Sequence, residues 1–65
     1  MQILTWYARH AKDLSLRELS DLTGIGKTTL NNIENGKVSP TLDQLEAIAA
    51  ALNVKITDLF DSPYK

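Results

Sequence analysis

The chain has 65 residues, a net charge of −1 and no cysteine. This length allows one domain whose folding buries only ~60% of the surface of the unfolded chain, so such a domain usually needs a disulfide, a metal or a partner subunit. Because the chain has no cysteine and one histidine, His10, disulfides are excluded and neither a metal site nor a cofactor is expected. A second copy of the chain is therefore the expected support.

No apolar run approaches the ~20 residues of a membrane span, and the N-terminus lacks the basic and apolar regions of a signal peptide. We therefore expect a cytoplasmic protein with no membrane contact, and the initial Met1 suggests that the chain begins there. The net charge is +1 over the first 37 positions and −2 over residues 38–65. A surface that meets nucleic acid should thus lie in the first part of the chain.

Apolar residues recur at helical spacing in the first two predicted segments. In residues 2–11 they are Ile3, Leu4, Tyr7, Ala8 and Ala11. The segment LSLRELSDLTG predicts a second helix, in which Ser15 is the N-cap and Glu18 completes a capping box. This helix should end at Thr23-Gly24, and its predicted buried stripe is Leu16, Leu19 and Leu22.

A third helix is predicted from its N-cap Gly26 to Asn35, after which Gly36 supplies a left-handed residue. Thr41 and Gln44 form the capping box of a fourth helix. The predicted end of that helix is Asn53, and its inner face is formed by Leu42, Leu45, Ile48, Ala49 and Leu52.

The segment ITDLF at residues 56–60 predicts a short fifth helix that packs onto the others, and residues 61–65 form a tail. Lys55 is a poor cap for this helix, so we expect it to fray. No segment alternates like a strand. The expected fold is therefore a compact, all-α domain over residues 1–65.

The residues Gly26-Lys27-Thr28 resemble the end of a phosphate-binding loop of a nucleotide-binding enzyme. Such a loop needs a glycine five residues before Gly26, where this chain has Asp21, and it must follow a strand rather than a helix. A parallel sheet with crossover helices does not fit into 65 residues. The phosphate-loop interpretation is rejected.

The second and third predicted helices instead form a helix-turn-helix over about residues 15–35, joined by the short turn Thr23-Gly24-Ile25-Gly26. Leu30 and Ile33 share one face of the third helix. The opposite face is polar and almost uncharged, and it carries Lys27, Thr28, Asn31, Asn32 and Asn35. Asn pairs with adenine, Lys donates to guanine, and Thr contacts a thymine methyl, so this face is typical of a helix that enters the major groove.

From Leu14 to Phe60 the chain resembles the Cro/lambda-repressor (XRE-type) helix-turn-helix family. The matching pieces are LSLRELS, TGIGKTTLNNIENGK, SPTLDQLEAIAAALNV and ITDLF, in family order and at family spacing. The resemblance implies a five-helix, lambda-repressor-like fold that binds double-stranded DNA through its third helix.

The resemblance also implies roles for particular residues. Base contacts fall on Lys27, Thr28 and Asn32, with Asn31 as a further candidate, and Arg17 falls where the family reaches a base or a phosphate. Asn35 and Lys37 match contacts to the DNA backbone. Arg9 and Glu34 match a partly buried ion pair, although two solvated charges are the alternative.

Other residues leave alternatives open. Leu59, Phe60 and Tyr64 could close a dimer interface, or the first two could complete the monomer core. Trp6 lies off the apolar stripe and could mark a partner surface or cover the core edge. One histidine without cysteine or a Ser/His/Asp group offers no catalytic arrangement, so neither enzymatic activity nor a small-molecule substrate is expected.

The sequence therefore predicts a sequence-specific DNA-binding transcriptional regulator, expected to repress and to bind as a homodimer. The alternative is a protein-interaction module, such as an antitoxin-like or adaptor protein, for which DNA is secondary or absent. The near-neutral charge favours the alternative, and the Asn-rich face beside the turn favours the regulator.

Overall fold

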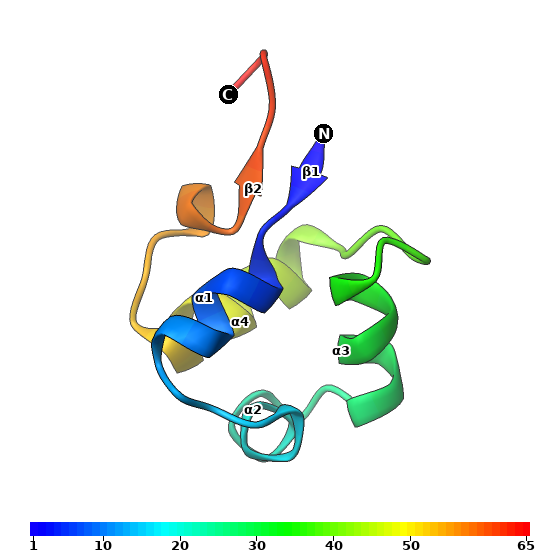
Figure 1. The fold of residues 1–65 in the computed structure, drawn as a ribbon, viewed down its shortest axis with the longest axis vertical. Coiled ribbons are helices and arrows are strands. Elements are labelled where there is room, and N and C mark those ends of the chain that lie inside the picture. Colours follow the sequence, from blue (N-terminus) through cyan, green and yellow to red (C-terminus); the bar gives the residue numbers. More distant parts are fainter.

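The computed structural model describes residues 1–65 and consists mainly of four α-helices (Figure 1). They are α1 (Thr5–Ala11), α2 (Leu16–Thr23), α3 (Lys27–Glu34) and α4 (Leu42–Leu52). A 3₁₀ turn, η1 (Ile56–Asp58), follows α4, and two short strands, β1 (Gln2–Ile3) and β2 (Phe60–Asp61), pair near the chain ends. No helix is long and apolar enough to cross a membrane.

The two ends of the chain differ from the all-α, five-helix expectation. Residues 2 and 3 pair with residues 60 and 61 in an antiparallel ribbon, with Ile3 opposite Phe60, so the first helix begins only at Thr5. The expected fifth helix over 56–60 is a single 3₁₀ turn, because Phe60 is committed to the ribbon. Helical periodicity does not detect a two-residue strand, whose partner lies far along the sequence.

The core lies where α2, α3 and α4 meet, with η1 and the following residue closing one end. Its buried side chains are Leu19, Leu30, Leu45, Ile48, Ala49, Leu52 and Leu59. Each comes from an apolar position that recurs at helical spacing or from the 56–60 segment. The predicted core is thus largely confirmed.

Four residues of the predicted apolar faces are exposed instead: the small Ala11, Leu22 by 61%, Leu42 by 77% and Tyr7 by 61%. On α2, Leu19 is buried and Ser20 and Thr23 are half-buried, so the buried face turns away from Leu22, which lies ~60° beyond Leu19. Leu42 is the first residue of α4 and precedes the turn that reaches the core. The apolar faces predicted for these helices therefore included residues that the structure leaves exposed.

The predicted helix boundaries follow local signals. Complete capping boxes at Ser15 and Thr41 begin α2 and α4. Left-handed residues follow α2 at Gly24, with φ 74°, and α4 at Asn53, with φ 55°. At Lys55, which was expected to be a poor cap, the Asp58 carboxylate accepts a 3.1 Å hydrogen bond from the Lys55 backbone N–H and holds η1.

Candidate nucleic-acid interface

The turn between α2 and α3 is fixed by two hydroxyl groups. Ser20 Oγ donates to the Ile25 carbonyl at 2.7 Å. Thr23 Oγ1 donates to the Leu19 carbonyl at 2.8 Å and accepts from the Ile25 N–H at 3.1 Å. Gly24 supplies the left-handed residue that redirects the chain. Sequence reasoning missed Ser20 and Thr23, although two hydroxyl residues beside a turn glycine are a usable signal.

One edge of α3 is anchored to the rest of the domain. Leu30 is 1% exposed and belongs to the core, and Ile33 is fully buried. At the C-terminal end of α3, Glu34 is held by Arg9 of α1. These contacts fix the position of α3 on the domain and its rotation about its own axis.

Arg9 and Glu34 form a bidentate ion pair between α1 and α3. Arg9 Nε lies 2.7 Å from Glu34 Oε2, and Arg9 Nη2 lies 2.9 Å from Oε1. Arg9 Nη1 also donates to the Leu14 carbonyl at 2.8 Å. The side chains are only 9% and 3% exposed. The hydrogen bonds that Arg9 donates to Glu34 raise the pKa of Arg9, and burial opposes this rise.

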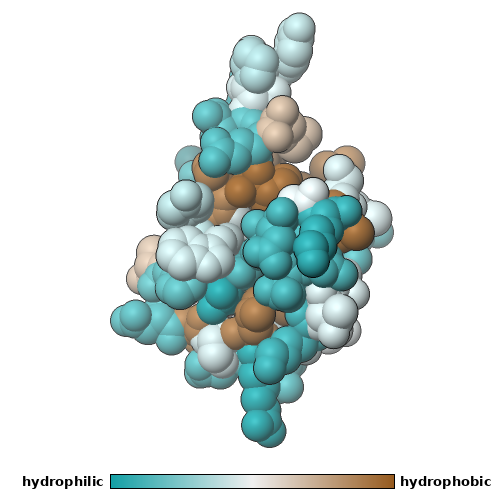
Figure 2. All heavy atoms as spheres, turned by 45° about the vertical axis from the view of Figure 1, so that its right-hand side comes forward, coloured by the Kyte–Doolittle hydropathy of each residue, from teal (hydrophilic) through white to brown (hydrophobic).

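The other face of α3 is open to solvent and polar (Figure 2). Lys27, Thr28 and Asn31 are exposed, and Asn32 is half-buried at the edge of this face. None of these four side chains makes a hydrogen bond within the chain. Their donors and acceptors are therefore free for an external partner. We call these four residues the α3 face.

The remaining predicted contact residues flank the α3 face. Arg17 is exposed at the second position of α2, and its chain neighbour Leu16 lines a hollow together with Lys27, Thr28 and Asn31. Asn35 and Lys37 are exposed just after α3. There the Lys37 N–H donates to the Asn32 carbonyl at 2.9 Å and holds the loop against the helix end.

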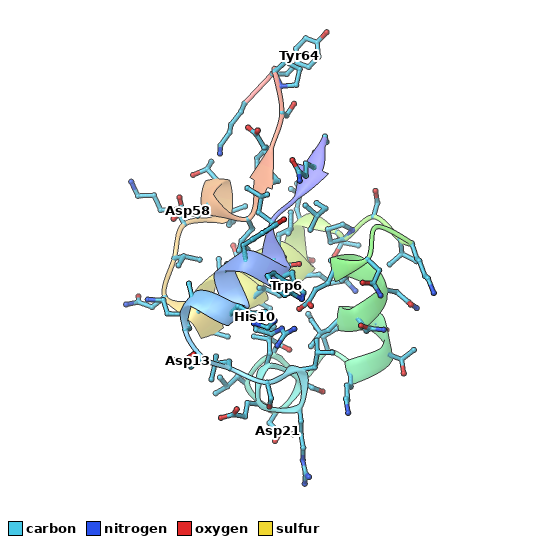
Figure 3. All side chains as sticks on the ribbon, viewed as in Figure 1. Trp6, His10, Asp13, Asp21, Asp58 and Tyr64 are labelled. Atoms are coloured by element: carbon cyan, nitrogen blue, oxygen red, sulfur yellow. The ribbon has the colours of Figure 1, made fainter.

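The predicted interface residues near the C-terminus do not form one surface. Leu59 is fully buried in the monomer core, Phe60 is half-buried in β2, and Tyr64 is 96% exposed. Leu59 therefore completes the core and is not accessible to a partner. Trp6 is 45% exposed and stacks on His10 with ring centroids 3.7 Å apart (Figure 3).

Comparisons with known proteins agree with this arrangement. The sequence profile of the helix-turn-helix family matches residues 7–59. The chain is 34% identical over 58 residues to the HTH-type transcriptional regulator SinR of Bacillus subtilis, covering 88% of the chain and 52% of SinR. It is 36% identical over 55 residues to the HTH-type transcriptional regulator SutR of Escherichia coli, covering 85% of the chain and 31% of SutR. The chain thus spans about half or less of the length of these relatives.

Two solved structures have the same fold. The N-terminal DNA binding domain of SinR superposes with a TM-score of 0.81 at 31% identity, covering 94% of this chain and 90% of that domain. The restriction-modification controller protein C.AhdI of Aeromonas hydrophila superposes with a TM-score of 0.82 at 28% identity, covering 86% and 85%. The chain belongs to the XRE-type helix-turn-helix family.

Proposed function

We propose that the chain is a sequence-specific, double-stranded DNA-binding transcriptional regulator that places α3 in the major groove. Membership of the helix-turn-helix family and the similarity to transcriptional regulators support this function. The observation that carries the proposal is the α3 face, a row of uncharged amides and a hydroxyl beside one lysine, all without partners in the chain. Side chains of this kind form hydrogen bonds with base edges.

The α3 face supplies the base contacts in this proposal. Asn31 and Asn32 carry the donor and acceptor pair that matches the major-groove edge of adenine. Lys27 donates to guanine, and Thr28 contacts a thymine methyl or donates a hydrogen bond. Because Asn32 lies at the buried edge of the face, its side chain is the most restricted and should discriminate bases most sharply.

Residues around the α3 face position the domain on the duplex. Arg17 is exposed next to Leu16, which lines the hollow at the start of α3, and would contact a phosphate or a guanine. Asn35 and Lys37 follow α3 and would contact phosphates, which fix orientation without specifying sequence. Phosphate contacts would supply much of the affinity and make it depend on salt.

We further propose that two copies bind a near-palindromic operator and repress the adjacent gene in the cytoplasm. A two-fold dimer places its recognition helices in successive major grooves, about 34 Å apart. The small core of this chain makes a partner subunit favourable for stability as well. An operator bound by both copies would block access of other proteins to the same DNA.

The test is selection from a random duplex library, followed by titration of the selected sequence against salt. We expect one half-site repeated at a spacing of one turn, with log affinity falling by about 0.9 per phosphate contact for each unit of log salt. Absence of enrichment, or equal binding to all duplexes, would contradict the proposal.

A protein-interaction module is the second candidate, and one surface favours it. Trp6 and Tyr7 are exposed along a groove that Val38 closes on the far side. Exposed aromatic side chains of this kind are enriched in protein interfaces. If the duplex selection failed, affinity capture from the native host with the wild-type chain and a Trp6→Ala variant would decide whether this groove binds a protein.

A further inference from the structure

We propose that a second copy of the chain docks into a groove on α1, on the two-fold axis of the homodimer. This inference rests on the homodimer proposed above and names its interface. The groove, which we call the α1 groove, lies between α1 and the segment that contains Val54 and the end of η1. It is lined by Leu4, Tyr7, Ala8, Val54, Lys12 and Asp58, among others.

The floor of the α1 groove is apolar and shaped for close packing. Leu4, Ala8 and Val54 are half-buried beneath it, and the ring of Tyr7 stands exposed at its side. Ala8 and Ala11 lie three residues apart on one face of α1 and both line the groove. Such small side chains allow another helix to approach closely, so the groove accommodates α1 of a second copy.

The charged residues at the α1 groove are complementary to the same residues of a second copy. Lys12 and Asp58 are the only charged residues in its lining, and they form no ion pair with each other. A two-fold axis that passes midway between these two residues would bring Lys12 of each copy to Asp58 of the other. Asp58 uses one carboxylate oxygen for the Lys55 N–H and keeps the second oxygen free. A purely acidic or purely basic partner would instead meet one like charge.

The position of the α1 groove leaves the DNA-binding surface free. No residue of the α3 face lines it, nor do Arg17, Asn35 or Lys37. Figure 3 shows Asp58 on the side of the molecule away from α3. The two copies can therefore associate without covering any proposed DNA contact. Leu59, which the sequence offered as a residue of the dimer interface, is buried in the monomer core and takes no part in this interface.

The experiment is sedimentation equilibrium of the full chain without DNA, using Lys12→Asp and Asp58→Lys. Each variant alone places like charges together at both symmetric contacts, so we expect the dimer dissociation constant to rise about tenfold or more. An equimolar mixture of the two variants restores both opposite-charge contacts. We therefore expect the mixture to form a heterodimer about as tight as the wild-type dimer.

Matched charge reversals outside the groove, Lys65→Asp and Asp43→Lys, should leave dimerisation unchanged, and circular dichroism checks the fold of every variant. The proposal is overturned if the wild type stays monomeric at its highest soluble concentration, if neither single variant weakens the dimer, or if the mixture fails to restore it. Binding of the same variants to a duplex with one half-site tests the DNA surface independently of the interface.

Discussion

The two helices of the helix-turn-helix have the same length but are stabilised in different ways. Both α2 and α3 contain 8 residues. The helix α2 begins with a complete capping box at Ser15, has Glu18 in its first turn and ends at a left-handed glycine. The N-cap of α3 is Gly26, which offers no side-chain cap, and the first turn of α3 has no acidic residue. Local sequence therefore specifies α2 much more strongly than α3.

The charges of α3 also oppose its macrodipole. Lys27 lies at the N-terminal end, where a positive charge is unfavourable, and Glu34 lies at the C-terminal end, where a negative charge is unfavourable. Thr and Asn in its interior have weak helix propensity. Tertiary contacts must make up for these local preferences. Departures from local consistency are expected at functional sites, and here they coincide with the α3 face and its anchor.

The largest expected effect comes from removing the anchor of α3. The variant Glu34→Ala leaves the nearly buried Arg9 charge without its partner, and breaking such a pair costs about 3–5 kcal/mol. Denaturant unfolding measures the loss, with Glu46→Ala, an exposed acid on α4, as the matched control. A loss below about 1 kcal/mol would mean that the pair acts like an exposed salt bridge. The double variant Arg9→Met with Glu34→Leu should recover most of the stability.

The second prediction concerns the face that α3 offers to a partner. Asn32→Ala should weaken binding to the selected operator by about 1–3 kcal/mol and relax the preference at one base pair. Asn35→Ala makes the same chemical change three residues later, where a phosphate contact is proposed. It should weaken binding to all duplexes alike. Fluorescence anisotropy on the operator and its single-base variants measures both, and equal relaxation by the two variants would contradict the assigned roles.

The third prediction concerns the N-cap that stabilises the start of α2. Ser15→Ala removes the oxygen that accepts the Glu18 N–H at 3.0 Å, and loss of such a cap costs about 1 kcal/mol of folding stability. Thermal unfolding measures the change. Ser39→Ala, at an exposed serine outside any helix whose side chain makes no hydrogen bond within the chain, serves as a control. An unchanged melting temperature would show that packing, rather than the cap, holds the start of α2.

The same capping box makes the stability of the folded state depend on pH. The backbone N–H of Ser15 donates to the Glu18 carboxylate, which lowers the pKa of Glu18 below its ordinary value of 4.5. A lowered pKa stabilises the folded state fully above pH 4.5, and this contribution is lost as pH falls through the lowered value. The variant Glu18→Gln should therefore lose less stability than the wild type on acidification.

How much of the fold followed from the sequence depends on the range of the interactions involved. The boundaries of α2 and α4 were predictable because caps and left-handed residues lie within a few residues of each helix end. The ribbon between residues 2–3 and 60–61 was not predictable, because its hydrogen bonds join opposite ends of the chain. The exposure of Leu22 and Leu42 escaped prediction because it depends on where neighbouring helices stop covering them.

The candidate site shows the same division. Helical spacing alone placed Lys27, Thr28 and Asn31 on one exposed face, and the structure has them there. The groove for a second copy combines α1 with Val54 and Asp58, more than 40 positions later, and no local pattern joins these segments. The roles of the α3 face in base recognition remain predictions, since they depend on a duplex whose sequence the chain does not encode.

The smallest expected effect comes from giving α3 the cap that α2 already has. Gly26 has φ −57° and ψ 143°, which a serine adopts without strain, and an added Cβ would meet only Thr29 Oγ1 at 3.9 Å. Gly26→Ser should therefore stabilise the domain by a few tenths of a kcal/mol, or about 1–3 °C in melting temperature. At Gly24, where φ is 74°, the same change should destabilise it.

The operator affinity of Gly26→Ser then separates two reasons for the missing cap. If tertiary contacts already hold α3 in its binding position, the added cap changes stability but not affinity, and equal affinity is the expected result. A change that is the same for every duplex would instead indicate that the new hydroxyl contacts a phosphate. A change in base preference would show that the cap rotates the helix. That result would contradict the conclusion that Leu30, Ile33 and the Arg9–Glu34 pair fix its orientation.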